Sequence, residues 1–176
     1  MGRKRRGVPI HGWLNIDKPS GISSNKVVGL IRGATNAAKV GHGGTLDPLA
    51  TGILPLALGE ATKTVSYTMD ALKSYKFTVR WGEARNTDDR EGTVIKTCDL
   101  RPTKSQITKI LKNFIGDIEQ TPPAFSAIKI GGRRAYELAR ANKAFELKSR
   151  IIHIDDFRFI RMLDNDHSEF QVSSGK

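Results

Sequence analysis

The chain has 176 residues and a formal net charge of +11, from 29 lysines and arginines against 18 aspartates and glutamates. That length fits one domain with a sizeable core. A single cysteine, Cys98, excludes an intrachain disulfide framework and a cysteine-based zinc cluster. No apolar run reaches the ~18 residues that span a bilayer. We therefore expect a soluble, cytoplasmic protein without a metal, whose charge suits nucleic acid; a basic surface that only keeps the protein in solution is the alternative.

The N-terminal residues are strongly basic, and the first regular elements follow them. Four cations and two glycines in the first seven residues predict a basic arm over residues 1–9, either a solvated tail or a segment that contacts a polyanion. A short strand over 13–16 and a turn over 18–21 come next. Ser23 or Ser24 then caps a helix, and the spacing of its apolar residues predicts a buried stripe of Val27, Leu30, Ile31 and Ala34.

Residues 41–52 read GHGGTLDPLATG, a composition that predicts an irregular loop. The loop contains one carboxylate, Asp47, followed by Pro48. Asp47 is either a nucleophile or base, or only the first residue of a turn, and spacing alone favours the turn. His42 is likewise either a titrating or base-stacking group or a surface imidazole bonded to the loop backbone.

The rest of the chain alternates strand and helix patterns. Apolar stripes predict helices over 60–72, with Val65, Met69 and Leu72 on one face, and after a capping box at 103–106, with Ile107, Ile110, Leu111 and Phe114 inward. The other predicted elements are a buried strand at 53–58, an alternating strand at 75–81, a charged loop at 82–92, a helix stop at Gly116, strands at 124–130, a hairpin turn at 131–132, a helix at 135–142, and strands at 150–161 and 169–173. Strands outnumber helices and are often neighbours in sequence, which predicts an α+β fold with a mixed, largely antiparallel sheet and packed helices. Because the chain stops directly after its last strand, we expect it to be part of a longer one.

Three further groups are candidates for binding a substrate. Tyr75 opens the alternating strand, where it either stacks on a base or belongs to the core. Asp88 and Asp89 form either a solvated acidic loop or a pair bound to an internal arginine. A basic patch with an aromatic suits phosphate contacts and stacking, or is a solvated face; its members are Lys129, Arg133, Arg134, Tyr136 and Arg140. The chain has no dinucleotide-binding glycine motif, no phosphate-binding loop and no GxSxG elbow.

Five blocks of sequence carry more information together than each does alone. They are GWLNIDKPSGISS at 12–24, GHGGTLDPLATGILPLALGEATK at 41–63, KSYKF at 73–77, TPPAFSAIK at 121–129 and GGRRAYELAR at 131–140. In this order and at this spacing, from about residue 10 to the end of the chain, they resemble the TruB family of tRNA pseudouridine synthases. The resemblance makes residues 10–176 the N-terminal part of a catalytic domain with the pseudouridine synthase fold.

The resemblance also implies a reaction and roles for individual residues. The family converts the uridine of the tRNA T-loop to pseudouridine after flipping the base, without a cofactor or a metal. Asp47 matches the essential carboxylate, which acts as nucleophile or base at the ribose. Tyr75 matches the tyrosine that stacks on the target base, and His42 the histidine that occupies the opened T-loop. Asp89 matches an acidic residue of an arginine–aspartate network around the catalytic carboxylate, and Lys18 and Pro19 match a motif that buttresses the loop.

The remaining expectations from the resemblance concern the loop framework and the partner. Residues expected to contact RNA include Lys18, Lys129, Arg133 and Tyr136, and those expected to shape the active-site loop are Pro19, Gly41, Gly44, Thr45, Leu46, Pro48 and Gly52. The partner is the T-arm of tRNA, with no membrane and no required protein partner, and we expect a monomer. The family's active-site arginine and its C-terminal RNA-binding module would lie beyond Lys176. Two alternatives stay open: a guide-RNA-dependent relative acting on ribosomal RNA, and a non-catalytic module that binds or folds tRNA.

Overall fold

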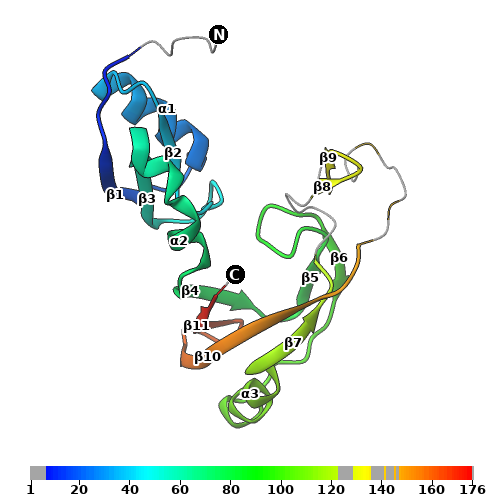
Figure 1. Cartoon of the computed structure of the whole chain (residues 1–176). Coiled ribbons are helices and arrows are strands. Elements are labelled where there is room, and N and C mark those ends of the chain that lie inside the picture. Colours follow the sequence, from blue (N-terminus) through cyan, green and yellow to red (C-terminus); the bar gives the residue numbers. More distant parts are fainter. Residues whose placement is uncertain (1–6, 123–128, 136–140, 142–144, 146, 176) are drawn as a thin grey trace. The chain divides into compact units, whose positions relative to one another are not determined.

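The chain consists of two compact units, Met1–Ala71 and Leu72–Lys176. The computed structural model describes residues 7–122, 129–135, 141, 145 and 147–175. Each unit has its own sheet and its own apolar cluster (Figure 1). All pairings between the strands described are antiparallel, and a single isolated parallel bridge joins Val8 to Ala37. The prediction of an α+β fold with a largely antiparallel sheet is therefore confirmed.

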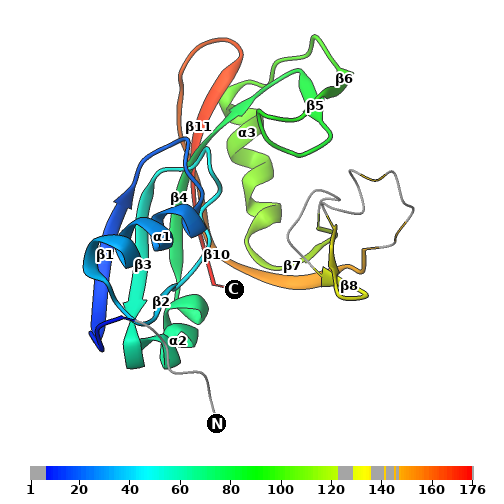
Figure 2. The ribbon, with the colours of Figure 1, turned by 90° about the horizontal axis from the view of Figure 1, so that it is seen from above.

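The first unit is a three-stranded sheet with a helix across one face. Its strands are β1 (Gly12–Lys18), β3 (Gly52–Leu58) and β2 (Val40–His42), in the order β1-β3-β2. Figure 2 shows α1 (Ser24–Thr35) lying across this sheet. The strand at 53–58 is buried as predicted from Leu54 to Leu58, with Pro55 partly buried, because β3 is the central strand and is covered by the helix; the prediction is wrong at Ile53, which is exposed.

Helix α1 begins where the sequence predicts, but its buried face is rotated. Ser23 is the N-cap, and its hydroxyl accepts a hydrogen bond from the Lys26 N–H at 3.2 Å. Val27 is buried against Leu54 and Leu56, and the partly buried Val28 and Ile31 extend this contact. The predicted stripe is wrong at Leu30 and Ala34, which are both exposed, because the face centred on Val27 and Ile31 turns these two positions outward.

A single helix over 60–72 was predicted after β3, and this prediction is wrong. The segment forms a 3₁₀ helix, η1 (Gly59–Lys63), and a short α-helix, α2 (Val65–Asp70), which meet at Thr64. Threonine hydroxyls compete for the backbone carbonyls here: Thr62 bonds to Gly59 at 2.7 Å and Thr64 to Ala61 at 2.9 Å. Leu72 lies beyond the helix and is exposed.

The second unit is built on a four-stranded antiparallel sheet in the order β4-β11-β10-β7. These strands are β4 (Lys73–Arg80), β11 (His167–Ser174), β10 (Arg150–Met162) and β7 (Gly116–Gln120). The three strands predicted at 75–81, 150–161 and 169–173 are confirmed as β4, β10 and β11. The register places Tyr75 opposite Val172 and Phe77 opposite Phe170.

Helix α3 (Lys104–Leu111) covers the apolar side of this sheet (Figure 1). Its predicted capping box is confirmed: the Thr103 side chain accepts from the Gln106 backbone, and the Gln106 side chain accepts from the Thr103 backbone. Ile107 and Leu111 are buried against Phe170 and its aromatic neighbours. The predicted stripe is wrong at Ile110 and Phe114, which are both exposed.

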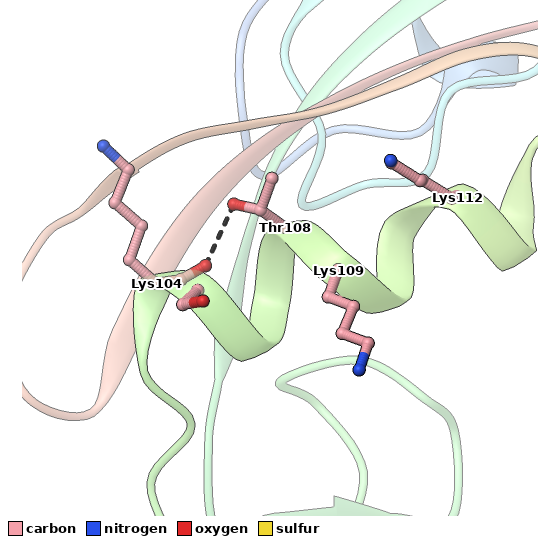
Figure 3. A pocket seen from close by; sticks show the side chains of 5 residues that line it. Lys104, Thr108, Lys109 and Lys112 are labelled. Atoms are coloured by element: carbon pink, nitrogen blue, oxygen red, sulfur yellow. Dashed lines mark hydrogen bonds between the residues drawn. The ribbon is translucent and has the colours of Figure 1, made fainter.

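The exposed side of α3 is basic. Figure 3 shows Lys104, Lys109 and Lys112 extending from the helix, with the Thr108 hydroxyl bonded to the Lys104 carbonyl at 2.9 Å. None of the three lysines forms an ion pair within the part of the chain that the structure describes. A turn of 3₁₀ helix, η2 (Lys112–Phe114), follows α3. Gly116, which has a φ of +91°, is the first residue of β7.

Two hairpins complete the second unit. The first pairs β5 (Glu83–Arg85) with β6 (Val94–Thr97), so the prediction of a loop over 82–92 is wrong at its start. The second pairs β8 (Lys129–Ile130) with β9 (Arg133–Arg134). Gly131 and Gly132 have φ of +55° and +84°, which confirms the predicted two-residue turn.

Two of the predicted elements fall on segments of uncertain placement. The helix at 135–142 and most of the strand region at 124–130 lie outside the described residues. Among the residues that are described, no helix has the length and apolar character needed to cross a membrane.

Candidate active-site loop

The segment that carries Asp47 joins β2 to β3 in the first unit. The predicted loop is shorter than expected, because Gly41 and His42 belong to β2 and Gly52 begins β3. We call the remaining residues, 43–51, the Asp47 loop. The Asp47 side chain is exposed and makes no hydrogen bond or ion pair with the residues that the structure describes. Its carboxylate is therefore available to a ligand.

A buried ammonium group supports the Asp47 loop from beneath. Lys18 is 0% exposed, and its Nζ donates to the carbonyls of Pro19 at 3.0 Å, Ile22 at 2.8 Å and Pro48 at 3.3 Å. A buried charge is tolerated only when it is well solvated by such partners. Lys18 thus links the turn after β1 to the Asp47 loop, which suits the expected supporting role. Because the side chain is buried, its ammonium group is not exposed for a contact with RNA.

Two serines add contacts that the sequence reasoning missed. The Ser20 hydroxyl donates to the Leu49 carbonyl at 3.1 Å. The Ser24 hydroxyl lies 2.9 Å from the Leu46 N–H nitrogen and 2.7 Å from the Leu46 carbonyl oxygen. For Ser24 the only sequence signal was its place in the Ser23-Ser24 pair, which the pattern assigns to helix capping alone.

A glycine outside the predicted set has the tightest surroundings of the loop. The Gly43 N–H donates to Pro55 at 2.7 Å, and the Gly43 carbonyl accepts from the Thr68 hydroxyl at 3.1 Å. A Cβ at Gly43 would lie 2.2 Å from the Thr68 Oγ1 and 3.4 Å from the Trp13 ring. A side chain at this position would therefore have to displace the packing between the loop and α2.

The predicted framework residues differ in what they contribute. Gly52 has φ of +114° and Gly44 of +155°, which favour glycine, whereas a Cβ at Gly41 would meet only the Thr62 methyl group at 3.9 Å. Thr45 is exposed and forms no hydrogen bond with the described residues. Pro48 contributes through its carbonyl, which also accepts the Gly21 N–H at 2.8 Å.

His42 ends β2 beside the Asp47 loop. Its Nδ1 is buried and is the one buried side-chain nitrogen or oxygen without a hydrogen-bond partner among the described residues. A buried polar atom in this state costs free energy that a bound partner would recover. His42 is therefore a candidate contact for a ligand.

Tyr75 lies in the second unit, on β4. Its side chain is 42% exposed, and partial burial raises the pKa of its phenol above the usual value. The hydroxyl is therefore protonated at neutral pH and can donate a hydrogen bond. The ring has an exposed portion on which a base could stack.

Asp89 lies in the turn between β5 and β6. Burial raises the pKa of its carboxyl, but hydrogen bonds from the Thr87 hydroxyl and from the N–H groups of Glu91 and Gly92, with the Arg85 charge, outweigh this and leave the pKa below its usual range. The Thr87 and Glu91 bonds measure 2.6 Å and 2.8 Å. These contacts close the turn, so Asp89 has a structural task in this unit.

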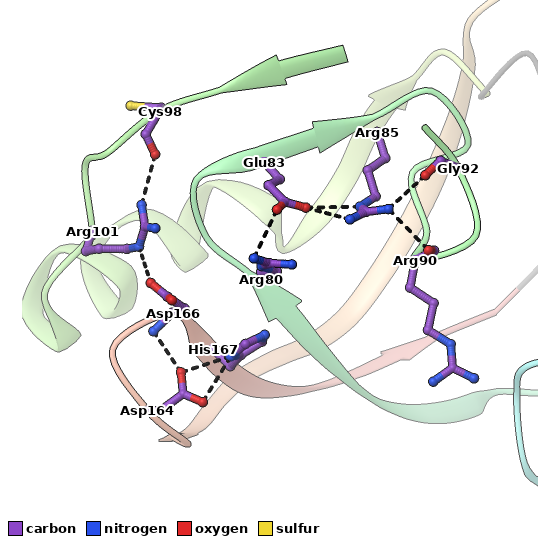
Figure 4. Close-up of polar contacts among 10 residues, drawn as sticks. All are labelled: Arg80, Glu83, Arg85, Arg90, Gly92, Cys98, Arg101, Asp164, Asp166 and His167. Atoms are coloured by element: carbon purple, nitrogen blue, oxygen red, sulfur yellow. Dashed lines mark hydrogen bonds and ion pairs between the residues drawn. The ribbon is translucent and has the colours of Figure 1, made fainter. Parts of the chain in front are cut away.

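Two arginines beside this turn, Arg80 and Arg85, already have partners (Figure 4). Arg85 pairs with Glu83 at 2.7 Å and donates to the carbonyl of Gly92 at 2.8 Å, while Arg80 pairs with the other Glu83 oxygen at 3.1 Å. The neighbouring Asp88 adopts a left-handed conformation with φ of +57°. Asp89 therefore lies near Arg85, but the carboxylate that pairs with Arg85 is that of Glu83.

The expected site residues fall into three groups. Lys18, Pro19, His42 and the Asp47 loop lie together in the first unit, and Tyr75 and Asp89 belong to the second. Lys129 and Arg133 lie on the β8–β9 hairpin, and Tyr136 lies outside the described residues. No group of three or more metal-ligating side chains occurs in the described part of the chain.

Solved structures share the fold of this chain. A chain of the Cbf5-Nop10-Gar1 complex is 28% identical, with a TM-score of 0.66 over 93% of this chain and 39% of that one. A chain of an H/ACA RNP bound to a substrate RNA containing 2'-deoxyuridine is 22% identical, with a TM-score of 0.64 over 99% of this chain and 44% of that one, which shows the fold alone. The chain thus has a pseudouridine synthase fold in incomplete form.

The sequence comparisons define the family. Residues 32–176 match the TruB family pseudouridylate synthase (N terminal domain). The tRNA pseudouridine synthase B of Rhodospirillum rubrum is 59% identical over 176 residues, which are all of this chain and 57% of that protein. The protein of the same name from Dinoroseobacter shibae is 53% identical over 176 residues and is covered to 58%. The chain belongs to the TruB family and spans just over half the length of these curated relatives.

Proposed function

We propose that this chain carries the catalytic aspartate of an enzyme that isomerises uridine to pseudouridine in the T-loop of tRNA. Relatives of more than 50% identity are named tRNA pseudouridine synthase B, which supports the reaction and the class of RNA. The net charge of +11 suits a tRNA partner in the cytoplasm. The proposed enzyme acts on the T-arm alone, as a monomer and without a protein partner.

The observation that carries the proposal is an exposed carboxylate on a tightly held loop. Asp47 is exposed, whereas the residues on both sides of it are bound through their backbones, by Ser24 at Leu46 and by Lys18 and Gly21 at Pro48. A catalytic group needs this combination of access and fixed position. A turn-forming aspartate needs neither the buried lysine nor the buried serine.

The reaction itself requires no cofactor. The N-glycosidic bond from the ribose C1′ to N1 of the base breaks, a bond from C1′ to C5 forms, and the proton on C5 leaves to solvent while N1 gains one. Atoms and electrons balance within the substrate, so no oxidant, reductant or metal is needed. Asp47 acts at the ribose, as nucleophile or as base.

The other site residues would hold the flipped nucleotide. Extruding a base costs a few kcal/mol, which stacking and hydrogen bonding offset. Tyr75 would supply the stacking surface, and the His42 ring would meet the opened T-loop. Asp89 would contribute by keeping its turn in shape, and Lys129, Arg133 and Tyr136 would contact the RNA.

Tritium release from a T-arm stem-loop carrying 5-tritiated uridine tests the proposal. We expect Asp47→Asn to lower the rate by at least about 10³-fold, because the carboxylate acts directly on the substrate. Asp99→Asn is the matched control, since Asp99 is an exposed carboxylate of the second unit outside the proposed site. Equal rates in the wild type and Asp47→Asn would overturn the role of Asp47.

A second candidate is a module that binds or folds tRNA without chemistry, which the net charge of +11 would serve equally well. This candidate predicts T-arm binding that Asp47→Asn leaves unchanged, with no tritium release from either protein. A guide-RNA-dependent enzyme would differ again, because it would not act on the bare T-arm without further components.

A further inference from the structure

We propose that Ser24 is a positioning residue for the Asp47 carboxylate. Its hydroxyl holds the backbone of Leu46 and thereby sets the direction in which the next residue leaves the protein. The consequence for catalysis rests on the proposed function of Asp47, whereas the clamp itself does not.

The contact is reciprocal and buried. Ser24 is the first residue of α1 and is 2% exposed. Its Oγ accepts the Leu46 N–H at 2.9 Å and donates to the Leu46 carbonyl at 2.7 Å. Both distances are typical of well-formed hydrogen bonds, and one side-chain atom satisfies both backbone groups of a residue 22 positions away.

The two bonds fix two successive peptide planes. The Leu46 N–H belongs to the peptide that follows Thr45, and the Leu46 carbonyl belongs to the peptide that leads into Asp47. Since a peptide is planar, the backbone between them has only the two soft dihedrals of Leu46. Holding both planes from one point restricts these dihedrals and places the Cα of Asp47.

The part of α1 that carries Ser24 is held in place by the apolar core of the first unit. Val27, one turn further along α1, is buried against Leu54 and Leu56 of β3. The partly buried side chain of Leu46 packs against the same cluster. Leu46 is therefore held by its side chain and by both of its backbone polar groups.

The other side of Asp47 is held independently. The Pro48 carbonyl accepts from the Lys18 ammonium at 3.3 Å and from the Gly21 N–H at 2.8 Å. The Asp47 carbonyl accepts the Ala50 N–H at 3.1 Å. With the backbone held on both sides, the remaining freedom of the carboxylate is the rotation of its own side chain.

Ser24→Ala removes the clamp on one side only. The Leu46 N–H and carbonyl lose their shared partner, and the loop can turn toward water to satisfy them. A displacement of a reacting group by about 1 Å costs about 10²-fold in rate. We expect the kcat for tritium release to fall by about that factor, with KM for the T-arm within about threefold, because the RNA-binding surface is untouched.

Ser23→Ala is the matched control. Ser23 is the adjacent serine and caps the same helix through the Lys26 N–H, but it forms no hydrogen bond with the Asp47 loop in the described part of the chain. Both variants destabilise the first unit, and only Ser24→Ala is expected to lower kcat. Ser24→Thr keeps a hydroxyl at the same position and is expected to recover kcat to within about tenfold of the wild type.

Hydrogen exchange of the Leu46 amide reports the clamp without any need for turnover. We expect its exchange to become at least about tenfold faster in Ser24→Ala and to stay unchanged in Ser23→Ala, because only the first loses the acceptor. Unchanged exchange in Ser24→Ala would overturn the clamp. Equal kcat in Ser24→Ala and Ser23→Ala would overturn the positioning role. Should Asp47→Asn keep full activity, the proposed function fails instead, and the exchange of Leu46 still decides whether Ser24 holds the loop.

Discussion

Gly43 is the residue of the Asp47 loop at which a side chain has no room. A Cβ atom at this position would lie 2.2 Å from the Thr68 Oγ1 and 3.1 Å from the Thr68 Cβ. Rotation of the Thr68 hydroxyl would relieve only the first contact, and that hydroxyl also donates to the Gly43 and Val65 carbonyls. The loop is therefore packed against α2 by a close approach that only glycine permits.

We expect Gly43→Ala to lower the free energy of unfolding of the first unit by about 1–3 kcal/mol, the usual cost of overpacking. Gly41→Ala is the control, because its Cβ would meet one methyl group at 3.9 Å, and we expect a change within about 0.5 kcal/mol. Urea denaturation followed by tryptophan fluorescence measures both, since Trp13 contacts the position. Equal effects of the two substitutions would show that the Thr68 contact relaxes without cost.

Asp89 makes stability depend on pH through its depressed pKa. A carboxyl whose folded pKa lies below its unfolded value stabilises the fold above the unfolded value, about 3.9, and loses that contribution as the pH falls through the folded pKa. We expect Asp89→Asn to destabilise the second unit at pH 7 by less than about 1 kcal/mol, since the group is largely screened by solvent. The difference from the wild type should shrink between pH 5 and the acid limit in urea titrations. If the difference in unfolding free energy is the same at every pH in this range, the effect comes from altered packing or hydrogen bonding of the turn and not from the charge of Asp89.

At the residue scale, the sequence indicated the carboxylate that we propose as catalytic, but not the contacts that hold it. Asp47 was found through blocks of sequence that resemble a family, whereas spacing alone favoured a turn. Ser24 and Gly43 were missed, because their roles depend on Leu46 and Thr68, which lie more than 20 residues away along the chain. No local pattern encodes a contact of that kind.

The elements of the second unit owe their boundaries to local chemistry, and α3 shows this most clearly. The Thr103 hydroxyl accepts from the Gln106 N–H at 3.3 Å, and the Gln106 carboxamide oxygen accepts from the Thr103 N–H at 2.8 Å. Both bonds satisfy backbone N–H groups that have no partner within the helix. The cap thereby positions Ile107 and Leu111 over the sheet.

We expect Thr103→Ala to cost about 1 kcal/mol of unfolding free energy, the typical value of an N-cap. Thr108→Ala removes a hydroxyl of the same helix that bonds only to the Lys104 carbonyl, so its effect should stay within about 0.5 kcal/mol. Thermal or urea unfolding of the two variants measures the difference. A loss as large in Thr108→Ala would mean that the cap adds nothing beyond a threonine hydroxyl.

Strands were predictable where side chains alternate, and helices were predictable at their starts. The alternating segment forms β4 as predicted, but of its apolar residues only Val79 is partly buried, whereas Tyr75 and Phe77 stay exposed. Helix faces were less predictable: Leu30 and Ile110 are exposed although they follow an apolar spacing, because the neighbouring element decides which face is covered. The break at Thr64 could not be read from apolar periodicity, since it arises from hydroxyl–carbonyl bonds.

At the scale of the whole molecule, charge is the property most relevant to an RNA partner. The 29 lysines and arginines exceed the acidic residues by 11, and several of them are neutralised locally, as Arg85 is by Glu83 and Arg101 is by Asp166 at 2.6 Å. Two groups have no such compensation in the sequence around them. They are the arm with Arg3, Lys4, Arg5 and Arg6, and the α3 face with Lys104, Lys109 and Lys112.

The spacing of these two groups predicts different effects on RNA binding. The four cations of the arm are consecutive in the sequence and so form the denser block of positive charge. At about 1.5 Å per residue, the α3 lysines lie about 7.5 Å and 4.5 Å apart along the helix axis and match fewer phosphates. We therefore expect the arm to neutralise more phosphates than the α3 face does.

The dependence of T-arm affinity on salt measures these contacts, because each neutralised phosphate contributes about 0.7–0.9 to the slope of log K against log salt. Replacing the four cations of the arm with glutamine should lower that slope by about 3, and replacing the three α3 lysines should lower it by less than about 1. Fluorescence anisotropy with a labelled T-arm between about 50 and 200 mM salt gives both slopes. The same decrease per charge removed in both variants would show that net charge, and not the arrangement of cations along the arm, attracts the RNA.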